Sequence, residues 1–277
     1  MMDSEISNAA ALNVWEREAV GSQRAGDASL GSPEYFERIR SYRYGYETPF
    51  IPRTFRFEAL SGKRVLEVGV GNGIDAVEMI RHGAVYTGID ISRNHLRLAR
   101  RHIELKRATA QLEDLIEGDL LYTELPGDYD VIYSFGVLHH IAHESAYLRK
   151  LRGLLKPGGE LRIGIYSRWS FFNFYLVATW LLKNRMRNSL NDWSSHIAER
   201  SELGQPVVIK IRSYRQIMRV LREAGFVPIH YEKRGFVKNY IPVVGRWLAS
   251  DGVVLSICAH ILGWYHCIIA VPDISLQ

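Results

Sequence analysis

The stretch that most constrains this chain is Val65–Asp75, which reads VLEVGVGNGID. Its first residues are typical of a buried strand, and its alternating glycines stand where that strand would pass into a helix. Glycine lacks a Cβ and tolerates positive φ, so such a backbone can approach a ligand closely. The amide groups that open the following helix present a positive dipole end to a carboxylate or phosphate. The stretch therefore predicts a cradle for a nucleoside-sized cofactor.

The composition is that of an ordinary globular protein of 277 residues, with 47% hydrophobic and 23% charged residues. This length suits one large α/β domain or a domain with a sizeable insertion. A net charge of +5 leaves room for an anionic substrate, a phospholipid surface or nucleic acid, although the basic residues are scattered. The two cysteines, Cys258 and Cys267, lack metal-type spacing, so we expect a cytoplasmic protein without a zinc site.

Two apolar stretches bear on whether the chain crosses a membrane. Phe171–Leu182 is too short to cross a bilayer as a helix. Val253–Val271 is long enough, but Gly263 and Trp264 indicate a break between a helix and a final strand. We therefore expect no membrane span, and a membrane contact stays a less favoured alternative.

From residue 61 onward, apolar strands alternate with helix-length segments. This alternation predicts a parallel sheet with helices on both faces, and ligands bind such sheets at the carboxyl ends of the strands. Ser32 and Pro33 predict the start of an earlier helix. The expected strands are 64–68, 85–89, 112–117, 130–134, 160–166, 226–232 and 264–271. The expected helices are 74–81, 92–106, one ending at 155, 169–182, 213–224 and 244–262.

The pattern divides the chain into four parts. Residues 1–60 are expected to form an N-terminal helical cap, and 61–167 the cofactor-binding core. Residues 168–211 read as an insertion with an apolar helix, a basic turn and a polar loop, after which 212–277 return to the core. The insertion is the expected substrate lid, with a dimer contact or a membrane contact as open alternatives.

Chemistry-bearing residues follow the ends of successive predicted strands. After the glycines of the first strand, Asp90 ends the second, where an acidic residue is placed to hold ribose hydroxyls. Asp90 could instead only cap the helix that begins at Ser92. Asp119 follows the third strand, where a carboxylate could accept from the exocyclic amine of adenine. Ser134 ends the fourth, where the reacting group would lie. Each signal is common alone, but their joint order predicts a nucleoside cofactor.

These pieces resemble the class I S-adenosylmethionine-dependent methyltransferases. The similar segments are VLEVGVGNG, TGIDIS, EGDL, YDVIYSFGVLHHI and LRGLLKPGGELRIGIY, which span roughly residues 62–166. The N-terminal block and the start of the insertion look like one bacterial subgroup of small-molecule enzymes, the methyltransferase domain 11/25-like proteins. The resemblance implies a Rossmann-like, seven-stranded α/β sheet with helices on both faces and an antiparallel final strand, and S-adenosylmethionine as cofactor.

The resemblance also implies roles for residues at matching positions. The residues that would contact the cofactor are Glu67, Gly69, Gly71 and Gly73 at the methionine end, Asp90 at the ribose, Ile91, Asp119 and Leu120 at the adenine, and Ser134 beside the sulfonium. Arg43 is a candidate partner for the cofactor carboxylate, or else an ordinary surface arginine. His140 and His139 are candidate bases if the acceptor must lose a proton. The candidates for the acceptor pocket, with ordinary packing as the alternative, are Tyr42, Tyr46, Tyr166 and Trp169.

The expected reaction is methyl transfer to an oxygen or nitrogen of a small, partly apolar acceptor, in natural-product or antibiotic biosynthesis. We expect a monomer or homodimer that binds no nucleic acid. The open alternatives are a lipid or quinone-like acceptor at a membrane surface, and a cofactor-binding partner without activity. A nicotinamide oxidoreductase would have the motif G-x-G-x-x-G after its first strand, whereas this chain has GVGNG there. A base-amine methyltransferase would have Pro-Pro-aromatic after the fourth strand, where Ser134–Val137 reads SFGV.

Overall fold

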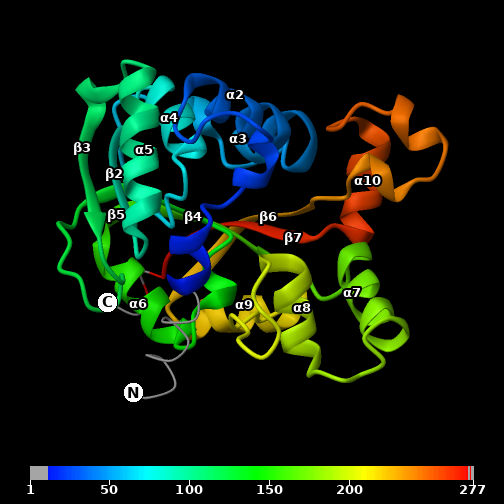
Figure 1. Ribbon diagram of the computed structural model, residues 1–277. Helices are drawn as coiled ribbons and strands as arrows, with labels where there is room; N and C mark the ends of the chain where they lie inside the picture. Colours follow the sequence, from blue (N-terminus) through cyan, green and yellow to red (C-terminus); the bar gives the residue numbers. More distant parts are fainter. Residues whose placement is uncertain (1–11, 274, 276–277) are drawn as a thin grey trace.

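The computed structural model describes residues 12–273 and 275 and shows one sheet with helices on both faces (Figure 1). Within the described residues, seven strands pair in the order β3-β2-β1-β4-β5-β7-β6. Only β7 runs antiparallel to its neighbours, β5 and β6. The strands are β1 (Arg64–Val68), β2 (Val85–Asp90), β3 (Leu112–Glu117), β4 (Tyr129–Phe135), β5 (Leu155–Tyr166), β6 (Phe226–Arg234) and β7 (Tyr265–Pro272). The predicted architecture is confirmed.

The helices start where local sequence favours a start. Ser32 and Ser92 accept hydrogen bonds from backbone N–H groups three residues on, and Ser213 forms a complete capping box with Gln216. The helices are α2 (Pro33–Tyr42), α3 (Ile51–Thr54), α4 (Ile74–Arg81), α5 (Arg93–Leu105), α6 (Glu144–Leu154), α7 (Phe171–Leu182), α8 (Leu190–Glu199), α9 (Tyr214–Glu223) and α10 (Val253–Leu262). Residues 12–17 are also helical.

Two apolar clusters make the sheet a three-layer structure. On one face, side chains of α4 and α5 pack with Tyr86 and Tyr133 of the sheet. On the other, side chains of α6 and α9 pack with Ile132 and Ile163. Strands β1, β2 and β4 and the second half of β5 are buried along most of their length, which is typical of parallel sheets that helices cover on both faces.

The structure corrects two expectations outside the core. The expected polar loop before residue 211 contains helix α8, which Ser189 caps by accepting from the Asp192 N–H. The single helix expected over 244–262 is a short 3-10 turn (Val244–Trp247) followed by α10. Gly245 permits the turn to pack against the Lys238 carbonyl, which a Cβ would approach to 2.0 Å, and the extended backbone at Leu248 and Gly252 separates the turn from α10.

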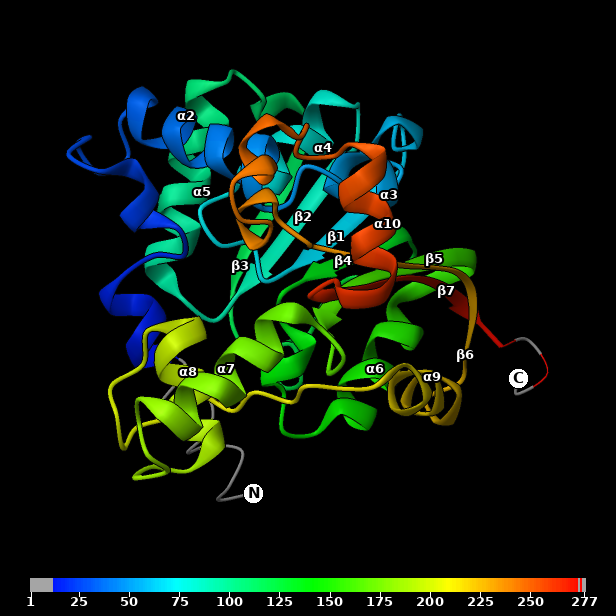
Figure 2. The same cartoon turned by 90° about the vertical axis from the view of Figure 1, so that its right-hand side faces the viewer.

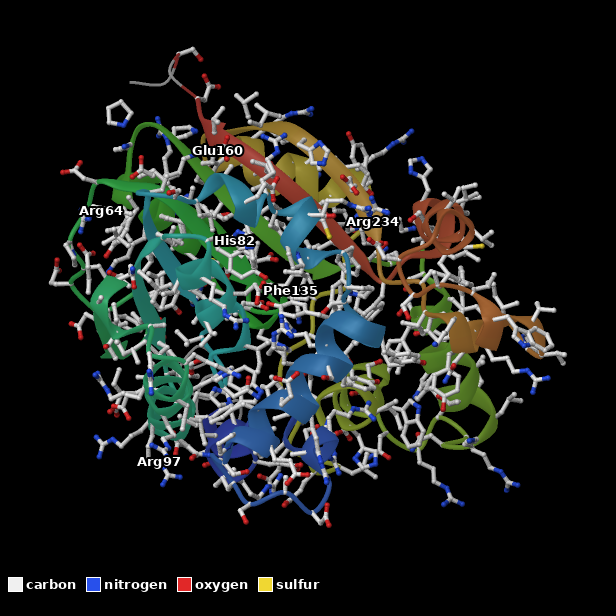
Figure 3. All side chains as sticks on the ribbon, turned by 90° about the horizontal axis from the view of Figure 1, so that it is seen from above. Arg64, His82, Arg97, Phe135, Glu160 and Arg234 are labelled. Carbon is white, nitrogen blue, oxygen red and sulfur yellow. The ribbon has the colours of Figure 1, made fainter. Side chains whose placement is uncertain are left out.

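The insertion and α10 lie at one end of the molecule. Figure 2 shows α7, α8 and α10 toward the viewer, beside the β6–β7 edge of the sheet. In the view from above, Phe135 of β4 lies near the middle of the molecule, whereas Arg97 of α5 points outward at the rim (Figure 3). None of the helices among the described residues has the length and apolar character needed to cross a bilayer.

Candidate active site

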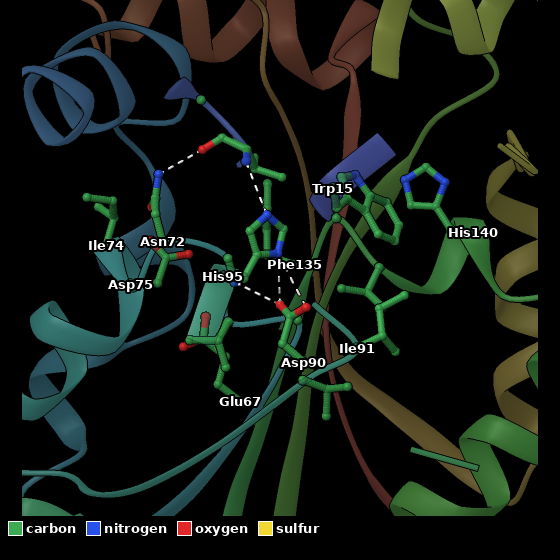
Figure 4. Close-up of a pocket in the computed structure, with 18 of the residues that line it drawn as sticks. Trp15, Glu67, Asn72, Ile74, Asp75, Asp90, Ile91, His95, Phe135 and His140 are labelled. Carbon is green, nitrogen blue, oxygen red and sulfur yellow. Dashed lines mark hydrogen bonds and ion pairs between the residues drawn. The ribbon is translucent and has the colours of Figure 1, made fainter. Parts of the chain in front are cut away.

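A cavity of about 310 Å³ opens at the carboxyl ends of β1, β2 and β4. Figure 4 shows side chains that converge there from separate parts of the chain. The N-terminal segment contributes Trp15 and Arg24, the core contributes the glycine turn, and α8 contributes Glu199. This is the edge of the sheet at which the sequence predicts the cofactor.

The glycines of the first turn are required by backbone conformation. Gly69, Gly71 and Gly73 have φ values of +85°, +55° and +76°. A Cβ on Gly73 would also lie 2.8 Å from the Ala99 Cα, so α4 and α5 could not approach as they do. Gly69 and Gly71 leave backbone exposed to the cavity, which suits close approach of a ligand.

Asp90 joins the glycine turn to the start of α5. Its carboxylate accepts hydrogen bonds from the Gly71 N–H at 3.0 Å and the Ser92 N–H at 2.9 Å. It also lies 3.3 Å from the His95 Nδ1. Asp90 therefore orders the turn and the helix start while it lines the cavity, so its two predicted roles are compatible.

His95 and Asn72 attach the N-terminal segment to this turn (Figure 4). The Val20 N–H donates to His95 Nε2 at 3.2 Å, and Asn72 Nδ2 donates to the Val20 carbonyl at 2.7 Å. Because Nε2 accepts, the proton of His95 is on Nδ1 and is donated to Asp90. The N-terminal segment is thus held in place by the same carboxylate that orders the glycine turn.

Arg43 pairs with a buried carboxylate beside the cavity. Its guanidinium donates both Nε, at 2.8 Å, and Nη2 to Asp75. Tyr44 and Tyr133 donate their hydroxyls to the same carboxylate at 2.6 and 2.8 Å. Burial alone would raise the pKa of Asp75, but the Arg43 charge and these hydrogen bonds outweigh it and hold the pKa below its usual value. Arg43 still lines the cavity, although its strongest partner is Asp75.

Glu67 has the opposite environment. It is buried at the end of β1, lines the cavity, and accepts a hydrogen bond from the Tyr86 hydroxyl at 2.5 Å. Burial, and then the negative charge of Asp75, raise the pKa of Glu67 well above its usual value. A cationic group entering the cavity would relieve both effects, so Glu67 is suited to an ammonium.

His140 lies on the far wall of the cavity in a defined tautomer. Its Nδ1 is 2.8 Å from the Val208 carbonyl, which can only accept, so Nδ1 carries a proton. Its Nε2 lies 3.8 Å from the Glu199 carboxylate. The Tyr166 hydroxyl donates to that carboxylate at 2.8 Å, and the Trp15 ring meets the imidazole edge-on at 5.3 Å. The Nε2 atom is thus presented to the cavity next to a negative charge.

His139 is placed differently from its neighbour. It is 1% exposed, stacks on Tyr166 with ring centroids 3.6 Å apart, and makes no hydrogen bond through either ring nitrogen to a described residue. Burial and the adjacent His140 hold its pKa well below the usual value. Among the described residues, one group of three could hold a metal ion: His139, His140 and Glu199 offer ligand atoms within 4.8 Å of one another.

The comparisons with known proteins agree with this geometry. Residues 66–161 match a family model described as a methyltransferase domain. The ubiquinone biosynthesis O-methyltransferase of Ralstonia nicotianae is 38% identical over 189 residues, which cover 68% of this chain and 71% of that protein. The chain belongs to the class I S-adenosylmethionine-dependent methyltransferases.

Two further similarities concern coverage and fold. The ubiquinone biosynthesis O-methyltransferase of Pseudomonas aeruginosa is 34% identical over 109 residues, 39% of this chain and 47% of that protein. The methyltransferase thus spans about half the length of several curated relatives it matches. The crystal structure of magnesium protoporphyrin IX methyltransferase from Synechocystis PCC 6803 with bound SAH has a TM-score of 0.59 and 15% identity. It covers 98% of each chain and shows the shared fold.

S-adenosylmethionine is the cofactor of this methyltransferase, and the cavity fits it. The open space beside Gly71 leaves room that a Cβ would fill, and Glu67 offers a buried carboxyl for the ammonium. Among the residues predicted from the sequence, those that line the cavity are Tyr42, Arg43, Glu67, Gly69, Gly71, Asp90, Ile91, Asp119, Leu120, His140 and Tyr166.

Other predicted residues of the methyltransferase lie off the cavity wall. The Ser134 hydroxyl donates to the Val68 carbonyl at 3.0 Å, and Gly73 caps α4. Tyr46 packs against Tyr42, and Trp169 is 58% exposed. His139 lies behind His140. Hydrogen bonding, helix capping or packing accounts for the positions of Ser134, Gly73, Tyr46 and His139, whereas Trp169 lies at the surface.

Sequence reasoning did not select several residues of the wall. These are Trp15, Arg24, Glu47, Phe135, Glu199 and Tyr265. Strand alternation offered Phe135 as the alternative to Ser134, because adjacent strand residues point to opposite faces, and the structure shows which face adjoins the cavity. Glu199 had no such signal, since it belongs to a helix that was expected to be a loop.

Proposed function

We propose that this methyltransferase methylates a hydroxyl oxygen of an aromatic, quinol-like acceptor. The observation that carries the proposal is the far wall of the cavity, where His140 Nε2 lies beside Glu199. The aromatic rings of Trp15, Phe135, Tyr166 and Tyr265 line the same cavity. The relatives whose names specify ubiquinone biosynthesis O-methyltransferases support an oxygen acceptor attached to a ring. The quinone-like alternative is therefore favoured over another natural product.

The cofactor supplies a methyl group that is already activated on a sulfonium, so the protein has to bind, orient and deprotonate the acceptor. Glu67 and the glycine turn would bind the methionine end, and Asp90, Ile91, Asp119 and Leu120 would bind the nucleoside. The aromatic rings would hold the acceptor flat and exclude water. The insertion would act as a lid through Glu199, and Tyr42 would close the opposite side.

His140 is the proposed base. Its Nδ1 proton is committed to the Val208 carbonyl, so its Nε2 lone pair is free to take the proton of the acceptor hydroxyl. The Glu199 carboxylate, 3.8 Å away, would stabilise the imidazolium that results. Tyr166 holds that carboxylate in place by donating a hydrogen bond. His139 would act only by packing, because its nitrogens are enclosed.

The test is an activity assay with purified protein, S-adenosylmethionine and a panel of ring hydroxyl and ring amine compounds, with products identified by mass. We expect methylated oxygen, and His140→Gln should lower kcat by roughly 10²- to 10⁴-fold. Cofactor affinity should not change in that variant. The matched control is His143→Gln, a histidine of the same loop that lies outside the cavity wall. Methylation confined to amines, or equal loss in both variants, would overturn the proposal.

A further inference from the structure

Helices α7 and α10 expose an unusual amount of apolar surface. On α10, Val253, Ile257 and Ile261 repeat every four residues and form one outward stripe, with Val253 76% exposed. On α7, Phe174 and Leu182 belong to a second stripe, with Leu182 78% exposed. We call the following set the apolar end: Trp169, Phe171, Phe174, Tyr175, Leu181, Leu182, Met186, Val243, Val244, Trp247, Val253, Val254, Ile257 and Ile261.

The two helices that form the apolar end are fixed side by side. The Lys233 ammonium donates to the Trp169 carbonyl just before α7 and to the Ile261 carbonyl in α10. Phe171 of α7 stacks on Tyr240, in the segment that leads to α10, with ring centroids 4.4 Å apart. Figures 1 and 2 both show α7 and α10 at the same end of the molecule. The exposed side chains therefore form a continuous patch rather than scattered single residues.

Basic side chains outnumber acidic ones around the apolar end, where the neighbouring Glu232 and Asp251 pair with Arg234 and Arg53. The stretches 168–191 and 233–250 contain eight Lys and Arg residues and no Asp or Glu. The remainder of the chain has 27 basic and 30 acidic residues and is therefore net negative. Basic side chains that are exposed at this end are Arg168, Lys183, Arg185, Arg187 and Arg246. Five exposed basic side chains thus lie where apolar side chains face outward.

We propose that the apolar end docks on the surface of an anionic phospholipid bilayer. Apolar side chains can insert at the boundary between headgroups and acyl chains while Lys and Arg contact lipid phosphates. The described helices are too short to cross a bilayer, so the contact is with the surface. A second copy on the same patch would bring two sets of exposed basic side chains together, which disfavours a symmetric dimer.

The patch adjoins the acceptor side of the cavity. The inner side of α7 packs through Leu176 into a cluster with Trp264 and Tyr166, and Tyr166 lines the cavity. Docking would place the cavity one helix away from the lipid, which suits an acceptor that carries an apolar tail. This last step rests on the proposed function, whereas docking itself does not.

The test is sedimentation of the full chain with phosphatidylcholine vesicles that contain or lack phosphatidylglycerol. We expect binding to the anionic vesicles that weakens as salt rises. The combined variant Lys183→Gln, Arg185→Gln, Arg187→Gln should weaken binding by roughly 100-fold. Val253→Asp with Ile257→Asp should abolish it. The matched control removes three exposed charges from α5, with Arg97→Gln, Arg100→Gln and Arg101→Gln, and should bind like the unmodified protein.

Three outcomes would overturn docking: equal binding to neutral vesicles, equal weakening by the α5 control, or no binding. A concentration-dependent dimer that Val253→Asp with Ile257→Asp dissociates would instead assign the patch to a second copy. Thermal unfolding of each variant checks that it folds. The measurement needs no methyl acceptor, so failure of the proposed activity leaves it interpretable.

Discussion

The ion pair between Arg43 and Asp75 allows a sharp test of how the N-terminal segment is held. Arg43→Gln removes the cation but leaves Asp75, which is 5% exposed. Removing one member of a buried pair costs about 3–5 kcal/mol. Because the hydroxyls of Tyr44 and Tyr133 would still donate to the carboxylate, we expect the lower end, about 3 kcal/mol at pH 7.

The sign of the pH dependence follows from the pKa of Asp75. In the unmodified protein this pKa lies below its ordinary value of 3.8, so the pair stabilises the fold above that pH. The stabilisation is lost as the pH falls through the folded-state pKa. Without Arg43, burial dominates and raises the pKa, so the variant is least stable near neutrality and recovers as Asp75 takes up a proton. The difference between the two proteins should therefore narrow on acidification.

Urea unfolding at pH 7 and at pH 5 measures both quantities, and Asp75→Asn with and without Arg43→Gln completes a double-mutant cycle. Arg93→Gln is the control, since the Arg93–Glu117 pair is exposed and its loss should leave the urea midpoint unchanged. A cost for Arg43→Gln below about 1 kcal/mol, or a difference that does not shrink toward acid, would refute the argument. If Arg43 instead binds mainly the cofactor, Arg43→Gln will lower the affinity for S-adenosylmethionine while the free energy of unfolding is retained.

Three further outcomes can be measured on the same protein. Gly73→Ala should destabilise the fold by roughly 2 kcal/mol or more, because the strain of a positive φ and the overlap with Ala99 add together. Gly71→Ala, with open space around it, should destabilise the fold by only about 1–2 kcal/mol. Equal urea midpoints for the two variants would contradict this. S-adenosylmethionine should bind more tightly as pH rises, since its ammonium favours ionised Glu67 and releases a proton; calorimetry in two buffers detects that proton, and Glu67→Gln should abolish it. Ser213→Ala should cost about 1 kcal/mol by removing the capping box of α9, whereas Ser29→Ala, a serine that caps no described helix, should have no effect on thermal unfolding.

The cofactor half of the site was predictable because its signals are local. The strand β1, the turn and helix α4 lie within Arg64–Arg81, and their bounds match the expectation at every end. Positive φ at the glycines is a property of the turn itself, independent of distant contacts. The strand order then brings Asp90 to the same edge, because parallel neighbours end together.

The acceptor half was harder to predict because its contacts span long sequence separations. The His140 Nδ1 bonds to Val208, and its Nε2 lies near Glu199, which belongs to a helix that reads as polar loop. Trp15 reaches the same imidazole from the other end of the chain. No short-range pattern encodes such a meeting, and even the distinction between Ser134 and Phe135 depends on which face of β4 the cavity adjoins.

Asp90 nevertheless connects the cofactor half of the site to the acceptor half. Its carboxylate orders the glycine turn through Gly71 and, through His95, the backbone of Val20. A ribose bound to Asp90 would therefore act on the segment that carries Trp15 to the acceptor wall. Asn72 of the glycine turn donates to the carbonyl of the same Val20. Both backbone groups of Val20, the N–H and the carbonyl, are therefore held by residues that line the cofactor cavity. Cofactor binding should thus order the acceptor pocket, which favours entry of the cofactor before the acceptor.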